Sequence, residues 1–343
     1  MLQIIIPVYN DEDNLRQALD SLIKQDKHNF ITAVVDDCST DDIEAVVNSY
    51  RNKLPISYMK TPHNGGPGVA RQYALDNMDE KIGYVMFLDS DDTLLPNATR
   101  ALCKEMGITN ADVLVSDFLV KGKSDEEDTV FAIDRNKTWM HGKIYRTAFL
   151  RQYGIRFPPV RVDEDVGFNI QVYALARKKA YLNEVTYCYN YNEKSITHSV
   201  IRPFILEYNK EFLVSVIYGL MHACLYLEDD AHFDQLVALC MRQFHILYEM
   251  AMYYKHNEES IRIQLDWFFN SPVISSKIQE REFFLYLAHY STAYVGTPDV
   301  IVFPKYSFQQ FITQFIPLPN YTIQLKTDIR EIAPDEFNAC VNR

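Results

Sequence analysis

The first 120 residues alternate between short apolar runs and segments in which apolar residues recur with a helical period. Residues 3–8, QIIIPV, form an apolar run, and residues 11–25 repeat apolar positions at i, i+3, i+4, i+7 and i+8. The same alternation predicts strands at 31–35, 56–60, 84–88 and 111–120, and helices at 41–50 and 68–78. Continuous apolar strands separated by helices predict an α/β fold with a mostly parallel sheet flanked by helices.

Polar residues and a proline mark where the predicted helices begin. We expect Asn10 to cap the first helix and either Ser39 or Thr40 to cap the second, because such side chains accept hydrogen bonds from free backbone N–H groups. We expect Pro96 to open the next helix after the strand at 84–88, since proline is favoured in a first helical turn.

The loops that follow the expected strands are rich in Asp, Asn, Gly and Pro. They are residues 9–11 (YND), 36–40 (DDCST), 61–68 (TPHNGGPG) and 89–92 (DSDD). Ligands of parallel α/β sheets bind outside the carboxyl ends of the strands. The sequence therefore predicts the functional site at this edge of the sheet.

The composition changes near residue 200. Segments 204–227, 231–256, 258–270 and 278–295 have a helical pattern, and residues 296–321 are interrupted by prolines. We expect two domains, an α/β domain at 1–200 and a mainly α-helical extension at 201–343. The pattern leaves three roles open for the extension: an acceptor platform, a dimer interface or a membrane-surface contact.

Composition excludes some classes of protein. With 343 residues, 48% of them hydrophobic, the chain can bury a sizeable core, and its net charge of −12 disfavours broad electrostatic binding to nucleic acid. The six cysteines form no CxxC pair, as expected of reduced thiols in a cytosolic protein. No apolar stretch reaches the length of a membrane span and no secretion signal is visible, so we expect a cytoplasmic protein.

Three carboxylates directly follow the apolar strand at 84–88, namely Asp89, Asp91 and Asp92. Buried like charges are costly unless a positive group lies among them. Two carboxylates one residue apart can converge on a hard divalent cation, which can also hold a diphosphate. A solvated turn is the alternative, and the position at the end of a central strand favours the cation.

Two other loops carry groups suited to a nucleotide. A carboxylate at Asp36 or Asp37 can accept a hydrogen bond from a nucleobase N–H. The glycine-rich turn at 63–68 lets backbone approach a ligand, and Arg71 offers a fork that fits phosphate or a base edge. A plain Gly-Pro turn is the alternative for this loop.

Two later segments carry reactive groups. Asp163, Glu164 and Asp165 begin an amphipathic helix, where acids either favour the helix start or supply a general base. In residues 194–198, KSITH, a lysine and hydroxyls can embrace a diphosphate. His198 is either a further metal ligand or a structural histidine.

The order of these motifs resembles the family 2 glycosyltransferases of the GT-A fold. The segments are IIIPVYNDEDNLRQALDSL, VVDDCSTDD, NGGPGVARQYAL, FLDSDDTLLP, HGKIYRTAFL, DEDVGFN and SITHS, within about residues 1–200. The resemblance implies a Rossmann-like GT-A domain and a metal-dependent, inverting transfer of a sugar to an acceptor hydroxyl. The implied donor is a nucleotide-sugar, usually UDP-linked, and the implied cation is Mn²⁺ or Mg²⁺ held by a DxD motif. The implied acceptor is a polysaccharide, a lipid-linked sugar or a surface glycan.

The resemblance also assigns roles to individual residues. Donor-binding roles fall on Pro7, Tyr9, Asp37, Gly65, Gly66, Arg71, Asp89, Ser90, Lys143, Lys194 and Ser195. Metal contacts fall on Asp89, Asp91, Asp92 and His198. Asp165, beside Glu164, is the implied catalytic base that removes the proton of the acceptor hydroxyl. In this scheme Asp37 meets the base, and Lys143 closes over the diphosphate.

Two positions depart from the family pattern. Cys38 stands where Gly or Ala is usual, and Asn190 stands near where the family often has an Arg that contacts the diphosphate. Three alternatives stay open: transfer to a hydroxylated base in DNA, an inactive nucleotide-sugar-binding protein, and a nucleotidyltransferase. The last would need a glycine-rich, basic loop after the first strand, and PVYNDEDN has none. Homo-oligomerisation is also open, and nucleic acid enters only as an acceptor.

Overall fold

The structure, a computed structural model, describes residues 1–26, 29–122, 129–131 and 138–192 and parts of 211–226. Its strands are β1 (Leu2–Val8), β2 (Phe30–Asp36), β3 (Ile56–Lys60), β4 (Tyr84–Phe87), β5 (Thr93–Leu94), β6 (Val113–Val120), β7 (Thr129–Phe131), β8 (Lys143–Arg146) and β9 (Lys179–Tyr189). Its helices are α1 (Glu12–Ile23), α2 (Ile43–Tyr50), α3 (Pro67–Asp76), α4 (Ala98–Thr109), α5 (Thr147–Gln152) and α6 (Glu164–Leu175).

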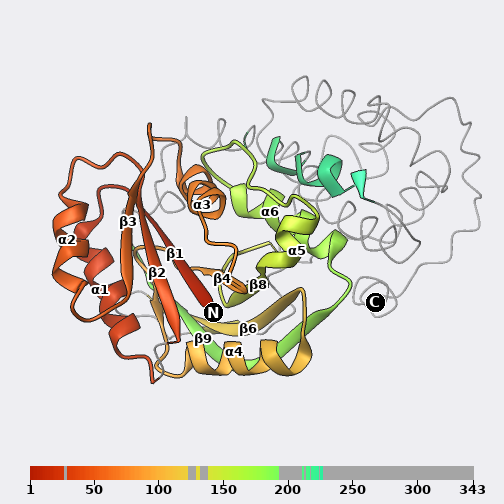
Figure 1. Cartoon of the computed structure of the whole chain (residues 1–343), viewed down its shortest axis with the longest axis horizontal. Helices are drawn as coiled ribbons and strands as arrows, with labels where there is room; N and C mark the ends of the chain where they lie inside the picture. Colours follow the sequence, from red (N-terminus) through yellow and green to blue (C-terminus); the bar gives the residue numbers. More distant parts are fainter. Residues whose placement is uncertain are drawn as a thin grey trace, which may run out of the picture. The chain divides into compact units, whose positions relative to one another are not determined.

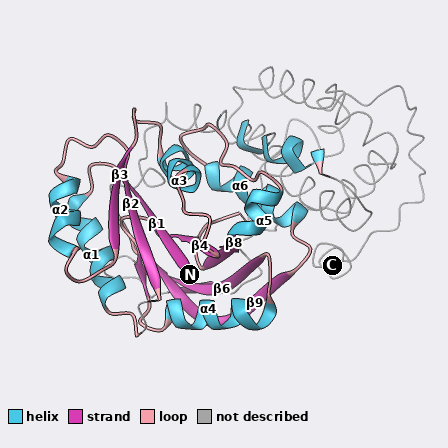
Figure 2. Ribbon diagram, viewed as in Figure 1, coloured by secondary structure: helices cyan, strands magenta, loops and turns pink. Residues whose placement is uncertain are grey.

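These strands form one sheet in the order β3-β2-β1-β4-β8-β6-β9-β5, with β7 paired to β6. The strands β3, β2, β1 and β4 are parallel, as the apolar runs predict. Beyond them β8 lies antiparallel between β4 and β6, and β6 pairs in parallel with β9. Figures 1 and 2 show this sheet with helices on both sides. The carboxyl ends of β1, β2 and β4 consequently lie side by side, which brings their loops together.

Helices cover both faces of the sheet because successive strand residues point to opposite faces. On one face Ile4 and Ile6 of β1 pack in a core that includes Leu15, Val46 and Leu102 of helices α1, α2 and α4. The other face contains an aromatic cluster in which Phe87 of β4 contacts three rings, those of Tyr145, Phe157 and Phe168. This cluster borders the candidate site, because the Arg71 guanidinium lies 5.8 Å from the centroid of the Phe157 ring.

The predicted helix caps were wrong. Helix α1 begins after Asp11, and in α2 the Asp42 side chain caps the helix by accepting from the Ala45 N–H at 3.0 Å. Asn10 instead accepts hydrogen bonds from the N–H of Thr40 (2.7 Å) and from its hydroxyl (3.1 Å). Since β1 and β2 end side by side, these polar residues link two loops rather than capping their own helices.

The other boundaries differ by a few residues. Helix α4 begins at Ala98, so Pro96 lies before its first turn rather than within it. The chain divides into two compact units, one with residues 1–172 and 176–200 and one with residues 173–175 and 201–343. The helices expected beyond residue 230 lie outside the described residues. Among described residues, none of the helices is both apolar and long enough to traverse a lipid bilayer.

Candidate active site

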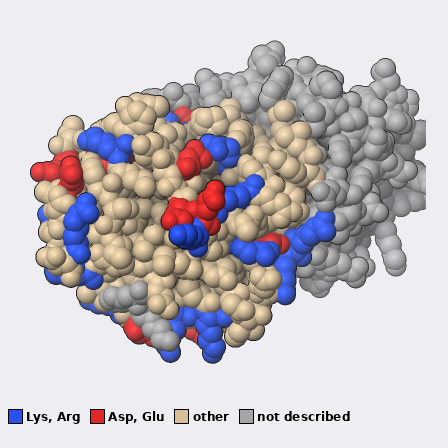
Figure 3. Space-filling view, in the orientation of Figure 1, with Lys and Arg blue, Asp and Glu red and all other residues tan. Residues whose placement is uncertain are grey.

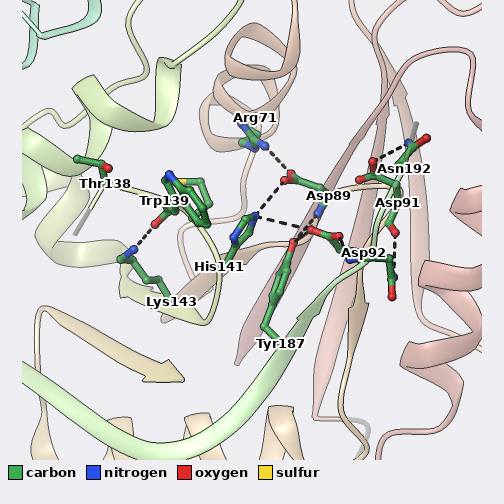
Figure 4. A network of polar contacts seen from close by, with 12 residues as sticks. Arg71, Asp89, Asp91, Asp92, Thr138, Trp139, His141, Lys143, Tyr187 and Asn192 are labelled. Atoms are coloured by element: carbon green, nitrogen blue, oxygen red, sulfur yellow. Dashed lines mark hydrogen bonds and ion pairs between the residues drawn. The ribbon is translucent and has the colours of Figure 1, made fainter. Parts of the chain in front are cut away.

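A buried ion-pair bridge joins three segments at the predicted edge of the sheet. Arg71 of α3 donates through Nη2 to Asp89 Oδ1 at 2.5 Å and through Nη1 to Glu164 Oε1. The Arg71 side chain is 5% exposed and Glu164 is 7% exposed, whereas Asp89, directly after β4, is 29% exposed. Arg71 is therefore a positive group among the acids, and it links the DxD segment to the Glu-Asp segment. Figure 4 shows its contact with Asp89.

The charges of this bridge shift its proton equilibria. Burial opposes ionisation of Asp89, but the Arg71 guanidinium and His141 hold the pKa of this carboxyl below its usual range. Burial, only partly offset by Arg71, raises the pKa of Glu164. The two acids raise the pKa of Arg71 against the effect of its burial. Arg71 and Asp89 are therefore charged at neutral pH.

A glycine makes the bridge possible. A Cβ added to Gly68, at the start of α3, would lie 2.7 Å from the Glu164 side chain. Any larger residue would push α3 away from α6, and the Arg71–Glu164 pair would separate. Gly66 has a φ of +89°, a conformation that glycine adopts without strain, so this loop needs glycine at two positions for different reasons.

The acids that follow Asp89 have separate environments. Asp91 is partly exposed and accepts from the Asn192 amide at 2.8 Å, and burial and the Asp89 charge raise its pKa to about 6. Asp92 is fully buried and accepts from the Tyr187 hydroxyl (2.6 Å) and the Asn190 N–H (2.9 Å). Asp91 is available to a ligand, whereas both Asp92 oxygens already hold β9 and the residues after it against the DxD loop.

His141 lies beside these acids, and its ring contacts Phe118 of β6 and Tyr187 of β9. Its Nε2 is 3.8 Å from Asp89 Oδ2 and 3.7 Å from Asp92 Oδ2, while its buried Nδ1 has no hydrogen-bond partner. The imidazole stacks on Tyr187 with ring centroids 4.9 Å apart. Burial lowers the pKa of His141, although Asp89 opposes the shift. One ligand atom from each of Asp89, Asp92 and His141 falls within a 4.8 Å group that could hold a metal ion.

Asp165 is the partly exposed acid of the Glu-Asp pair. Its Oδ1 accepts from the Val166 N–H at 2.8 Å at the start of α6. Burial and the neighbouring charges of Glu164 and Asp163 raise the pKa of Asp165 well above its usual value, and Arg71 offsets this only in part. A raised pKa increases the proton affinity of a carboxylate, which suits a general base.

Asp37 holds the glycine loop. It accepts from the N–H groups of Gly65 at 3.1 Å and Gly66 at 2.7 Å, and from the Thr61 hydroxyl at 2.8 Å. Asp37 is 3% exposed, so contact between its carboxylate and a nucleobase requires these hydrogen bonds to be shared or exchanged. The structure thus brings the predicted residues of these two loops together. Holding the glycine loop is a structural role of Asp37 that the sequence did not predict.

The remaining predicted site residues differ in accessibility. Pro7 is buried in β1, Tyr9 is 51% exposed at its end, and Ser90 donates to Asp11 Oδ2 at 2.9 Å. Lys143 is fully buried, and its ammonium donates to the carbonyl of Trp139. Lys143 is therefore placed inside the fold, in contrast to the expectation that it covers a bound diphosphate. Three other predicted residues, Lys194, Ser195 and His198, lie outside the described part of the chain.

The structure shows the conformation of Cys38 and the contacts of Asn190, the two positions that depart from the family pattern. Cys38 has a φ of 62°, in the left-handed region that favours glycine. Asn190 donates through its amide to the Asp91 carbonyl at 2.9 Å and through its backbone N–H to Asp92. An asparagine here anchors the DxD loop, which is a different task from the phosphate contact of an arginine.

Sequence reasoning missed several residues of the site. His141 and Tyr187 were not selected, because a lone histidine and an aromatic strand residue carry no local signal. Asn169 was also missed, although it lies one helical turn after Asp165 and its amide donates to the Asp165 carbonyl at 3.1 Å. The spacing of four residues on a predicted helix was the one available clue.

Comparison with known proteins places this geometry in context. Residues 3–181 match the family model described as glycosyl transferase family 2. The chain is 30% identical over 252 residues to the Staphylococcus aureus poly(ribitol-phosphate) beta-N-acetylglucosaminyltransferase TarS, which covers 68% of this chain and 42% of that protein. It is 29% identical over 208 residues to a poly(ribitol-phosphate) beta-glucosyltransferase of Bacillus spizizenii, covering 55% and 32%. The chain spans less than half the length of these two relatives.

Solved structures share the fold. The crystal structure of S. aureus TarS 1–349 in complex with UDP-GlcNAc matches with a TM-score of 0.52 and 21% identity, covering 88% of this chain and 94% of that one. A mannosyltransferase from Pyrobaculum calidifontis in complex with GDP-Man and Mn²⁺ matches with a TM-score of 0.52 and 13% identity, covering 84% and 85%. The predicted GT-A fold is therefore confirmed.

Proposed function

The chain belongs to glycosyltransferase family 2, and from this premise we propose that it transfers a sugar from a nucleotide-sugar to a hydroxyl of a surface glycan polymer, with inversion. The observation that carries the proposal is the Arg71 bridge between Asp89 and Glu164. Through this one side chain, the DxD carboxylate on the donor side is held at a fixed position relative to the Glu-Asp pair that supplies the base. A transferase needs its donor and its base held in this kind of fixed relation.

The donor is proposed to be UDP-linked. Asp37 and the loop with Gly65 and Gly66 would receive the nucleoside beside Tyr9, at the carboxyl ends of β1 and β2. Support comes from the TarS structure, which was solved in complex with UDP-GlcNAc, whereas the P. calidifontis mannosyltransferase was solved with GDP-Man. The UDP assignment therefore follows the relative with the higher sequence identity.

The acids of the DxD segment fit a divalent cation. Burial and the negative charge of Asp89 raise the pKa of Asp91 to about 6, and a cation bound beside Asp91 would favour its ionised form. Asp89 and Asp91 would hold the cation as the DxD pair. When bound, the cation would neutralise charge that grows on the departing nucleoside diphosphate.

The reaction follows from the position of Asp165. The acceptor oxygen forms a bond to the anomeric carbon as the bond from that carbon to the diphosphate oxygen breaks. The acceptor proton passes to the Asp165 carboxylate, whose raised pKa makes it a stronger base. Glu164 accepts from Arg71 and so orients the first turn of α6, which carries Asp165. Attack from the face opposite the leaving group inverts the anomeric centre.

The acceptor class and the domain roles are also proposals. The names of the two relatives favour poly(ribitol phosphate) as the acceptor polymer. Residues 1–200 are proposed as the catalytic domain, and residues 201–343 as an extension that serves acceptor binding or self-association.

The most direct test is a thermal-shift screen of UDP-, GDP- and TDP-sugars with Mn²⁺ or Mg²⁺. A ligand that binds only the folded protein must raise its stability. We expect UDP-sugars with a cation to raise Tm, and the Asp165→Asn protein to show the same shift without turnover. No shift with any sugar nucleotide would contradict the donor assignment.

A further inference from the structure

Residues at and just after the end of β9 hold the DxD loop by its backbone and by its buried acid. The Tyr187 hydroxyl and the Asn190 N–H donate to the two carboxylate oxygens of Asp92 at 2.6 and 2.9 Å. The Asn190 amide donates to the Asp91 carbonyl at 2.9 Å. The Asp89 N–H donates in turn to the Tyr187 hydroxyl at 3.3 Å. The end of β9 therefore fixes the backbone from which the Asp91 side chain projects.

One more residue of this segment contacts a carboxylate that the proposed cation would use. The Asn192 amide nitrogen donates to Asp91 Oδ2 at 2.8 Å, and Figure 4 shows this contact. An ionised carboxylate can only accept hydrogen bonds, so the amide must present its nitrogen and not its oxygen. Both residues are partly exposed, and among the described residues Oδ2 is the only Asp91 oxygen that accepts from another side chain. Asn192 therefore holds one oxygen of Asp91 and leaves Oδ1 available to a ligand.

The other carboxylate of the DxD pair is also held by one oxygen, but its partner is charged. Asp89 Oδ1 accepts from the Arg71 guanidinium at 2.5 Å. This positive charge offsets part of the charge on Asp89. The asparagine amide carries no net charge, so it leaves the full negative charge of ionised Asp91 to a cation. The strength of cation binding should consequently depend strongly on Asp91 and on its orientation.

We propose that Asn192 is a positioning residue for the DxD cation, because its amide orients the Asp91 carboxylate so that Oδ1 faces the ion. This inference rests on the proposed cation and adds a residue that sets its affinity. Carboxylates that bind metals are in turn hydrogen-bonded, and losing such an outer partner lowers metal affinity about 10–100-fold. A neutral donor suits this task, since it orients the carboxylate without competing with the cation for its charge.

Diffuse attraction of cations to an acidic protein is the alternative. The net charge of −12 favours such attraction in general. On the face that Figure 3 draws, however, Lys and Arg side chains of the described residues are interspersed with Asp and Glu. Diffuse attraction also weakens with salt, because the Debye length is about 8 Å at roughly 0.15 M. Binding that persists in this salt and depends on Asn192 is therefore local.

Binding of Mn²⁺ to the full chain tests this role without requiring turnover. The electron paramagnetic resonance signal of free Mn²⁺, recorded with UDP present at roughly 0.15 M salt, gives the Kd of the ion. Asn192→Leu has nearly the same shape and lacks the donor, so it should raise this Kd about 10–100-fold. Asn192→Ala removes the same donor without filling space and should also raise it. Asn192→Gln retains the amide and should restore most of the affinity.

Asn97→Leu is the matched control. The Asn97 amide also donates to a carboxylate, Glu184 Oε2 at 3.3 Å, but this exposed pair includes no residue of the DxD loop. The Kd for Mn²⁺ should therefore stay at its wild-type value in Asn97→Leu. The Tm of metal-free Asn192→Leu should lie near that of the wild type, because Asn192 is partly exposed. This measurement separates a positioning role from a general loss of the fold.

The outcomes separate this role from the assignments on which it rests. An unchanged Kd in Asn192→Leu and Asn192→Ala, or an equal rise in Asn97→Leu, would overturn the positioning role alone. A wild-type protein that binds no Mn²⁺ would overturn the cation assignment and this role together. Failure of the proposed transfer has a different sign, since the wild-type protein would then show no Tm shift with any sugar nucleotide, whether or not Mn²⁺ binding depends on Asn192.

Discussion

Replacing Arg71 with methionine gives the sharpest test of the central bridge. Methionine keeps most of the side-chain volume and removes the charge, so Asp89 and Glu164 lose their shared partner. The two acids respond differently, because Glu164 is 7% exposed and Asp89 is 29% exposed. Glu164 has little access to water after the change, whereas Asp89 can regain part of its hydration.

The expected loss follows from this burial. Removing one partner of a buried ion pair costs about 3–5 kcal/mol, because the other charge is left uncompensated. Arg71 also lies 5.8 Å above the Phe157 ring, a cation–π contact that methionine does not replace. We expect a loss of about 3–5 kcal/mol, equivalent to a fall in Tm of roughly 5–15 °C.

Thermal unfolding followed by circular dichroism measures this change, and the chain offers a matched control. Arg156 pairs with Asp76 through two hydrogen bonds of 3.0 and 2.7 Å, but these side chains are 49% and 45% exposed. Arg156→Met should cost about 0–1 kcal/mol, as exposed pairs do. Equal losses in the two variants would refute the reasoning, since it attributes the larger loss to the burial of the Arg71 pairs.

The pH dependence supplies a second criterion. Even with Arg71 beside it, burial raises the pKa of Glu164 above its ordinary value of 4.5. Without the guanidinium, the pKa of Glu164 should rise further. The folded state then holds a proton that the unfolded state releases, so stability is retained below about pH 4.5 and lost as the pH rises. Arg71→Met should therefore approach wild-type stability in acid. Adding Glu164→Gln should restore part of the loss at neutral pH, and a further fall would contradict this explanation.

Three further predictions concern activity. Asp165→Asn should lower turnover roughly 10²–10⁴-fold while preserving donor binding. Product formation measures the turnover, and thermal shift measures the binding. Weakened binding with normal turnover would exclude Asp165 as the base. Burial, Glu164 and Asp163 raise the pKa of Asp165, so the reaction rate should increase with pH over a range above the ordinary carboxyl pKa. Asp163→Asn should move this rise in the pH–rate profile to lower pH. An unchanged profile would argue against this electrostatic origin. Asp91→Asn should abolish the cation-dependent activity, and full wild-type activity in EDTA would rule out a role for the metal.

The sequence determined the frame of this protein. Apolar runs such as residues 3–8 followed by helical periods specify strands and helices locally, and parallel strands place their following loops at one edge. The position of Asp89 and Asp91 at that edge was consequently predictable. The helix caps were not predictable, because Asn10 and Thr40 are hydrogen-bonded to each other across two loops instead of capping helices. This hydrogen bond exists only because the two strands before these loops are adjacent.

Tertiary structure decided what neutralises the acids. The sequence placed three carboxylates directly after a buried strand, where they need a positive group nearby, and a divalent cation was the expected group. The fold adds Arg71, which is 18 residues from Asp89 and 93 residues from Glu164 in the chain. Only the close packing of α3 on α6, permitted by Gly68, brings the three together. Local patterns record which residues are buried, but the partner of a buried charge is fixed by packing between elements that are distant in sequence.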